Sequence, residues 1–173
     1  MSTIEIKKIG ITELDTDAIV NAANDGLWEG SGVCGAIFRE AGSAELTRAC
    51  NAIGGCKTGS AVITPGFNLK AKHVIHAVGP RWMGGGNNEP ELLYSAYKQA
   101  LILAKENGLH SIGFPLISAG IFGYPPDGAW RQALQACSDF IKGNQDYDIR
   151  IIFAVLDDRI LNLGEKMLKD IAV

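Results

Sequence analysis

The chain has 173 residues, of which 47% are hydrophobic and 20% are charged, and its formal net charge at pH 7 is −3. This length and composition are typical of one folded domain with its own core, so we expect a single domain over residues 1–173. The negative net charge argues against general binding to nucleic acid or to anionic membranes.

The predicted elements alternate between short apolar runs and longer helical patterns, which is typical of an α/β fold with helices on both faces of the sheet. A polar–apolar alternation predicts an edge strand over residues 3–9. The other strands are predicted over residues 18–20, 61–63, 74–75, 112–114 and 151–155. Helices are predicted over residues 33–50 with an interruption near Gly42, and over residues 93–104, 127–142 and 158–171. Residues 82–88 predict a surface loop.

The cysteines Cys34, Cys50, Cys56 and Cys137 form no CxxC pair, and the first residues lack the apolar stretch of a secretion signal. No apolar run approaches the roughly 20 residues that cross a bilayer. We therefore expect a cytoplasmic protein without a membrane segment. His73 and His76 point to opposite faces of a predicted strand, so we assign them to packing and expect neither a metal site nor a cofactor.

A glycine-rich loop follows the strand that ends near Val20. The chain passes through Asn21 to Asn24 and reaches Gly30 to Gly35, where a helix is predicted to begin. Glycine lets the backbone approach a ligand closely, and the amides at the start of a helix bind phosphate oxygens. Charge-assisted hydrogen bonds contribute roughly 1.5–3 kcal/mol each, so a few of them would hold a diphosphate without a lysine.

The same glycines also satisfy the GxGxxG pattern of nicotinamide-dependent dehydrogenases. In those enzymes the glycines lie directly after a strand, whereas here they lie about ten residues beyond it. Residues 51–60 contain no Asp or Glu that would bind the ribose. We therefore reject a dehydrogenase, and the absence of a GxxxxGK[ST] segment leaves no support for a P-loop hydrolase.

A second glycine loop runs from Ser118 to Pro125, between the strand over residues 112–114 and another predicted helix. Open α/β folds bind ligands at the carboxyl edge of the sheet, so we expect the two loops to meet at one pocket. Remote positions for Gly32 and Gly120 would overturn this expectation.

Four segments in this order resemble the macrodomain family, namely residues 21–24, 30–35, 74–80 and 118–123. The resemblance covers nearly the whole chain. It implies a three-layer α/β/α sandwich with a mixed, largely parallel six-stranded sheet. It also implies a cleft for ADP-ribose or a related nucleotide-like ligand, with ADP-ribosylated proteins as partners.

Within that cleft the resemblance places Asn24 at the ribose next to the scissile bond, both glycine loops at the diphosphate and Phe122 beside the same ribose. The residues implied to contact the ligand are Ala23, Asn24, Gly30, Ser31, Gly32, Val33, Cys34, Gly35, Ser118, Ala119, Gly120, Ile121, Phe122, Gly123 and Leu156. Trp28, beside the first loop, either covers the cleft or packs against the protein.

Two departures from the family pattern concern the adenine. Gly10 stands where many members carry an Asp that binds the adenine amino group, and Leu156 stands where an aromatic residue often stacks on the ring. Loss of the Asp contact costs roughly 1–3 kcal/mol, or about 5- to 150-fold in affinity. Asp157 or Asp158 could replace that acceptor, although a helix N-cap is the favoured role.

Two further departures concern catalysis. In the deacetylase and de-ADP-ribosylating branch the first loop carries an Asp and the next helix a His, where this sequence has Cys34 and Phe38. The usual group that activates water is thus absent. Coronavirus macrodomains also lack this Asp, and the resemblance implies that they hydrolyse ADP-ribose esters. In such a mechanism Asn24 orients the ribose while the phosphate of the substrate helps to position water.

Cys34 raises a separate catalytic hypothesis, because a thiol in a glycine loop at the start of a helix can act as a nucleophile. No His lies close to it in the sequence, so a small residue that fits beside phosphate is the favoured interpretation.

Three functions remain open: a hydrolase of ADP-ribosyl linkages or of O-acyl-ADP-ribose, a non-catalytic reader of ADP-ribose, and a binder of another nucleotide-like metabolite. Asn24 and the two loops favour the hydrolase, Cys34 and Phe38 favour the reader, and the altered adenine positions favour the third. We favour the hydrolase.

Overall fold

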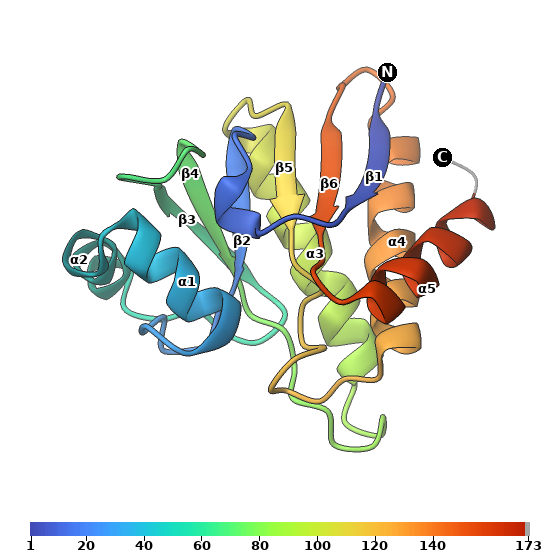
Figure 1. Ribbon diagram of the computed structural model, residues 1–173, viewed down its shortest axis with the longest axis horizontal. Coiled ribbons are helices and arrows are strands. Elements are labelled where there is room, and N and C mark those ends of the chain that lie inside the picture. Colours follow the sequence, from blue (N-terminus) through green and yellow to red (C-terminus); the bar gives the residue numbers. More distant parts are fainter. Residues whose placement is uncertain (172–173) are drawn as a thin grey trace.

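Six strands form one sheet in the computed structural model, which describes residues 1–171 (Figure 1). The strands are β1 (Thr3–Lys7), β2 (Ala18–Ala22), β3 (Ala61–Pro65), β4 (His73–Ala77), β5 (Ser111–Phe114) and β6 (Arg150–Ala154). Their order is β1-β6-β5-β2-β4-β3, and β3 alone runs antiparallel to its neighbour. The predicted strands, the edge position of β1 and the mixed, largely parallel sheet are therefore confirmed.

The helices form a layer on each face of the sheet, as expected. One layer contains α1 (Gly32–Ala41) and α2 (Ser43–Ile53), and the other contains α3 (Glu89–Glu106), α4 (Pro126–Gly143) and α5 (Asp158–Lys169). The predicted interruption between α1 and α2 falls at Gly42, whose φ of 108° is unfavourable for other residues. Asp157 is the N-cap of α5, because its carboxylate accepts from the amides of Arg159 and Ile160. No helix within residues 1–171 is long and apolar enough to cross a membrane.

The core lies on both faces of the sheet, because successive residues of a strand point to opposite sides. Val20 and Phe153 face α3 and α4, whereas their neighbours Ile19 and Ile152 face α1 and α2. All four side chains are buried. The strands therefore need apolar residues at consecutive positions, which explains the continuous apolar runs in the sequence.

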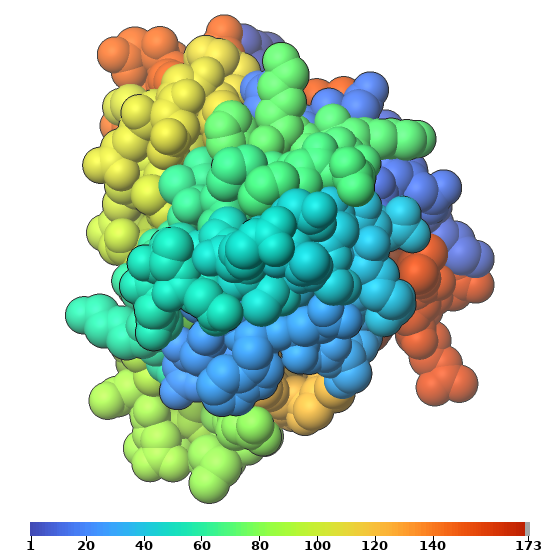
Figure 2. Space-filling view, turned by 90° about the vertical axis from the view of Figure 1, so that its left-hand side faces the viewer, coloured from blue at the N-terminus to red at the C-terminus, as the bar shows by residue number. Residues whose placement is uncertain are grey.

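The two glycine loops follow neighbouring strands, because β2 and β5 lie side by side in the sheet. Their pairing is limited to Ala18 with Ile112 and Ile19 with Gly113, near the amino ends of both strands. Beyond these pairs the carboxyl ends lead into the loops. Figure 2 shows the first loop in blue, the second in pale orange and the segment near residue 85 in yellow-green at the same lower edge of the molecule.

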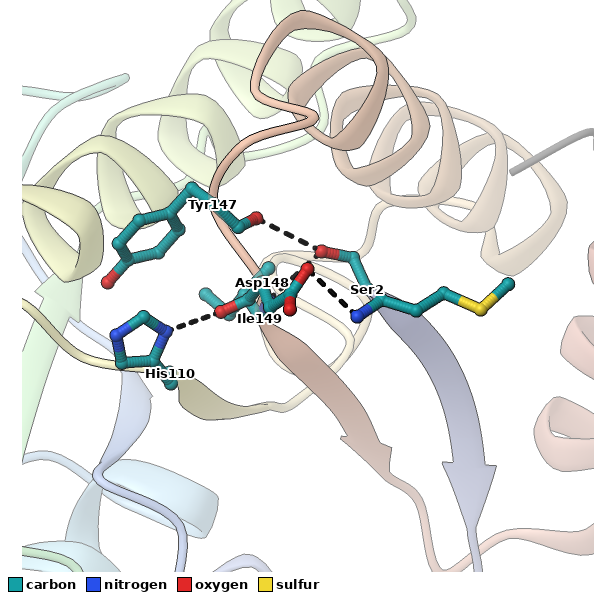
Figure 3. Close-up of polar contacts among 6 residues, drawn as sticks. Ser2, His110, Tyr147, Asp148 and Ile149 are labelled. Atoms are coloured by element: carbon teal, nitrogen blue, oxygen red, sulfur yellow. Dashed lines mark hydrogen bonds and ion pairs between the residues drawn. The ribbon is translucent and has the colours of Figure 1, made fainter.

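A polar network lies at the amino ends of β1, β5 and β6, at the end of these strands away from the glycine loops (Figure 3). The Ser2 hydroxyl donates to the carbonyl of Tyr147 at 3.2 Å and accepts from the amide of Ile149 at 3.0 Å. The His110 ring donates through Nδ1 to the carbonyl of Asp148 at 2.6 Å and stacks on Tyr147. This network fixes the starts of three strands, at the end of the sheet remote from the loops.

Candidate functional site

A cavity of about 800 Å³ lies at the carboxyl edge of the sheet and is lined by both glycine loops. Gly32 from the first loop and Gly120 from the second both line it, so the expected common pocket is present. Its floor contains Val78 and Gly79, which follow β4, and Pro115, which follows β5. The cavity therefore occupies the position at which parallel α/β folds bind ligands.

The first loop presents main-chain amides where α1 begins. The amides of Gly32, Val33 and Cys34 precede the first helical bond, which Gly35 donates to the Ser31 carbonyl at 3.3 Å, and they have no acceptor among the described residues. Gly32 has a φ of 59°, and a Cβ there would meet no atom within 4 Å. The three amides and the positive end of the helix dipole are suited to an anion such as a phosphate.

The second loop is closed on itself and leaves its central amides free. The Tyr124 amide donates to the Ser118 carbonyl at 2.9 Å, and that of Gly123 donates to Gly120 at 3.0 Å. The amides of residues 120–122 donate no hydrogen bond within the part of the chain that the structure describes. Ser118 has a left-handed φ of 68°, and its buried hydroxyl has no partner among residues 1–171. This strained backbone turns the loop towards the cavity.

Tyr97 of α3 holds the cavity floor from below. Its hydroxyl accepts from the amide of Ile117 at 2.8 Å and donates to the carbonyl of Pro115 at 3.1 Å. Burial raises the pKa of this phenol far above its ordinary value, so the hydroxyl keeps its proton. The floor is thus fixed by a neutral buried group.

Asn24 lies in the cavity wall, directly after β2, and also organises the chain that follows it. Its Nδ2 donates to the Trp28 carbonyl at 3.0 Å, and its Oδ1 accepts from the Trp28 amide at 3.0 Å. The side chain of Asn24 can still donate one N–H of Nδ2 to a ligand and accept one hydrogen bond at Oδ1. Trp28 lines the cavity, keeps 61% of its surface exposed and lies with its ring against Gly26, so both roles predicted for it stay open.

Cys34 lines the cavity but is 7% exposed, and its Sγ lies 3.7 Å from the Trp28 carbonyl. Phe38 is fully buried one helical turn further along α1 and packs edge-on against His76 in the core. Neither side chain supplies a carboxylate or an imidazole to the cavity. All four cysteines of the chain are free thiols.

Several of the predicted contact residues lie outside the cavity wall. The residues that line it are Ala23, Asn24, Gly30, Ser31, Gly32, Val33, Cys34, Ser118, Gly120, Ile121 and Phe122. Gly35, Ala119, Gly123 and Leu156 do not line it. Gly35 is needed for packing, because a Cβ there would lie 2.6 Å from the Gly30 carbonyl oxygen. Leu156 is 67% exposed, and the Gly10 amide donates to the Glu13 carboxylate at 3.1 Å.

The cavity wall also contains side chains that sequence reasoning did not identify. They are Asp25, Thr58, Arg81, Asn87, Glu89 and Leu92. Asp25 directly follows Asn24, and Arg81 directly follows the Val78–Pro80 stretch, so adjacency to recognised segments was the available signal. Asn87 and Glu89 gave no such signal, because their surroundings have the composition of a surface loop.

Glu89 holds that loop against the cavity. Its carboxylate accepts from the amides of Met83 at 2.7 Å, Gly85 at 3.0 Å and Asn87 at 2.6 Å. Burial opposes ionisation, but the amide donors outweigh it and lower the pKa of Glu89 below its ordinary value. The loop over residues 82–88 is therefore held in one conformation by Glu89, and Asn87 is its residue in the cavity wall.

A buried polar chain runs beneath the cavity between β2, β4 and β3. The Asn21 amide donates to Nδ1 of His76 at 3.0 Å, so Nε2 carries the proton and donates to the Thr64 hydroxyl at 3.0 Å. Burial lowers the pKa of His76 to about 4. Because the imidazole is neutral and enclosed, we assign it to the fold. No cluster of three or more metal-ligating side chains is present among residues 1–171.

The comparisons with known proteins agree on one family. The sequence matches the Macro domain over residues 20–133. It is 51% identical over 144 residues to an O-acetyl-ADP-ribose deacetylase of Salmonella typhimurium, covering 81% of this chain and 80% of that protein. It is 45% identical over 171 residues to a macro domain-containing protein of Caldanaerobacter subterraneus, covering 97% of each.

The fold agrees with the same assignment. The macrodomain of Oceanobacillus iheyensis, solved with ADP, superimposes with a TM-score of 0.90 at 38% identity, covering 98% of this chain and 91% of that one. A variant of that macrodomain has been solved with ADPR and gives the same TM-score. The chain therefore belongs to the macrodomain family.

Proposed function

We propose that the chain is one macrodomain that binds ADP-ribose in the cavity and hydrolyses its esters, either O-acyl-ADP-ribose or ADP-ribose attached to protein side chains. The observation that carries this proposal is the meeting of two amide-bearing loops, with Gly32 and Gly120, at one cavity that also contains Asn24. The deacetylase named among its relatives and the nucleotides in its structural neighbours support the same ligand class.

The diphosphate is held by the main chain. The free amides belong to two separate loops, residues 32–34 and residues 120–122, that line the same cavity. A pyrophosphate carries its charge on oxygens spread over two phosphorus atoms, so two separate sets of donors suit it better than a single helix end. No lysine is required for this part of the cleft.

The distal ribose lies beside Asn24, which orients it through the unused positions of its side-chain amide. Water attacks the acyl carbonyl carbon, the bond from that carbon to the ribose oxygen breaks, and the ribose oxygen receives a proton. The products are a carboxylic acid and ADP-ribose. The protein supplies geometry, and the phosphate of the substrate positions the water. The cavity wall described has no imidazole, and of its two carboxylates, Asp25 and Glu89, the second already accepts from three amides.

Two observations favour other functions. Cys34 and the buried Phe38 leave the first loop without the Asp and His of the deacetylase branch, which favours a non-catalytic reader of ADP-ribose. On the adenine side, Gly10 offers no carboxylate and Leu156 lies outside the cavity wall, which favours a ligand with a different base-side group. Both alternatives use the same phosphate loops.

Calorimetry with ADP-ribose, followed by incubation with O-acetyl-ADP-ribose and with a mono-ADP-ribosylated protein, separates the three functions. We expect the protein to bind ADP-ribose and to release ADP-ribose from at least one of the two substrates. Binding of ADP-ribose without release of product from either substrate would favour the non-catalytic reader. Absence of binding to ADP-ribose would reject the proposal and leave the third function.

A further inference from the structure

We propose that Arg81 makes the enzyme selective for acyl groups that themselves carry a carboxylate, such as succinyl, over uncharged groups such as acetyl. This inference rests on the proposed hydrolysis of O-acyl-ADP-ribose and names the class of acyl group that a cation in the cavity wall would select.

Arg81 is the one cationic side chain that lines the cavity within the described residues. It forms no ion pair with any residue in the range 1–171, and its guanidinium donates none of the hydrogen bonds found there. An unpaired guanidinium with five donors in the wall of a ligand cavity is a site for an anionic group of the ligand.

The position of Arg81 is fixed by the second loop. Its guanidinium carbon lies 4.8 Å from the centre of the Phe122 ring, over the ring face. The neighbouring Trp82 amide donates to the Phe122 carbonyl at 2.8 Å and ties the two segments together. A guanidinium stacked on an aromatic face keeps its edge free for a planar, bidentate partner such as a carboxylate.

The other charged side chains that line the cavity are two carboxylates, Asp25 and Glu89, and neither forms an ion pair with Arg81 within residues 1–171. Glu89 is in the same wall, but its carboxylate is occupied by three amides of the loop over residues 82–88. Asp25 is exposed and forms no ion pair with Arg81. An incoming carboxylate therefore has a free cationic partner, and Leu92 and Thr58 supply apolar and polar surface for a short acyl chain.

The diphosphate is the competing partner for this cation. In the proposed complex the diphosphate already has amide donors from both loops, whereas an anionic acyl group has Arg81 as its one cationic partner among the lining residues described. In a partly exposed site, a bidentate guanidinium–carboxylate pair is expected to change kcat/KM by about tenfold.

The test compares kcat/KM for O-succinyl-ADP-ribose and O-acetyl-ADP-ribose in the wild type, Arg81→Met, Arg81→Lys and the control Arg48→Met, which changes an exposed arginine of α2 outside the cavity. We expect the ratio of kcat/KM for the succinyl ester to kcat/KM for the acetyl ester to be about ten in the wild type and in Arg48→Met. The ratio should be near one in Arg81→Met and intermediate in Arg81→Lys. The wild-type ratio should also fall as salt is raised.

A wild-type ratio near one, or a ratio that stays near ten in Arg81→Met, would overturn the inference. Arg81→Met could also weaken binding of ADP-ribose and lower kcat/KM for both esters by the same factor, leaving the succinyl-to-acetyl ratio unchanged. That result would assign Arg81 to the diphosphate and would also overturn the inference. If both esters bind but neither is hydrolysed, the proposed hydrolysis fails alone. The ratio of the two dissociation constants then tests the selectivity of Arg81 by the same criterion, with a ratio near one overturning it.

Discussion

Both polar atoms of the Asn24 side chain bond to the main chain of one residue, Trp28, at 3.0 Å each. The residue expected at the ribose therefore also fixes the turn that carries an aromatic side chain to the cavity wall. Ligand binding and loop order are coupled through one amide.

Asn24→Ala is expected to lower both stability and affinity. Two hydrogen bonds are lost at about 0.5–1.5 kcal/mol each, so the free energy of unfolding should fall by about 1–3 kcal/mol. Affinity for ADP-ribose should fall at least about tenfold, because the turn loses its anchor. Urea unfolding and calorimetry measure the two effects. The control Asn107→Ala, which loses one exposed bond to Leu103, should bind normally, and unchanged affinity in Asn24→Ala would contradict the assignment.

Cys34→Ser tests the thiol hypothesis. The sulfur lies close to the Trp28 carbonyl, and the cavity wall described contains no histidine or lysine to act as its base. Turnover of O-acetyl-ADP-ribose should therefore stay within about tenfold of the wild type. Loss of all turnover with intact binding of ADP-ribose would instead support a nucleophilic thiol.

Gly120→Val should separate ligand binding from folding. A Cβ at Gly120 meets no atom within 4 Å, so the fold accepts the side chain and Tm should change by less than about 2 °C. The added atoms narrow the cavity beside the free amides, and affinity for ADP-ribose should fall at least about tenfold. Gly143→Val, at the end of α4 and equally free of neighbours, is the matched control. Equal affinities in the two variants would count against the second loop as a ligand site.

Glu89→Gln should release the loop over residues 82–88. The neutral side chain keeps one acceptor oxygen where the carboxylate now serves three amides. Hydrogen exchange at Met83, Gly85 and Asn87 should become at least about tenfold faster. Glu91→Gln, an exposed neighbour in α3, should leave these rates unchanged. Slow exchange in Glu89→Gln would mean that other contacts hold the loop.

His76 predicts a pH dependence of stability. Burial lowers its pKa from 6.5 to about 4, so between these values the unfolded chain binds a proton that the folded chain does not. Stability is therefore retained above pH 6.5 and lost as the pH falls towards 4, by about 3 kcal/mol at most. Urea unfolding of the wild type and of His76→Gln across this range measures the difference. Parallel pH profiles would remove His76 as the cause.

The fold was predictable from the sequence because each element carries a local pattern. The apolar runs of the strands reflect burial on both faces, and the break at Gly42 reflects a backbone angle that glycine adopts easily. The meeting of the two glycine loops was also predictable, since both loops follow strands at the carboxyl edge of the sheet and Gly32 and Gly120 line one cavity.

The places of Glu89 and Arg81 in the cavity wall were not predictable, for a physical reason. The Glu89 carboxylate accepts from three amides of the polar, glycine-rich loop that precedes it. The Arg81 guanidinium is positioned by stacking on Phe122, which lies 41 positions away in the sequence. Contacts of this kind depend on tertiary structure and leave no periodicity. Leu156 illustrates the converse, because a place in a family pattern does not establish that a residue faces the cavity.

The division of the cleft into a main-chain half and a side-chain half has a consequence for how this protein can diversify. Mutations in and around the glycine loops that preserve backbone geometry leave the amides in place, so the proposed phosphate binding would tolerate changes in the neighbouring side chains. The opposite half depends on the identity of single residues such as Arg81. If the proposed function holds, selection can change which acyl group is preferred, one residue at a time, without altering the main-chain donors of the two loops.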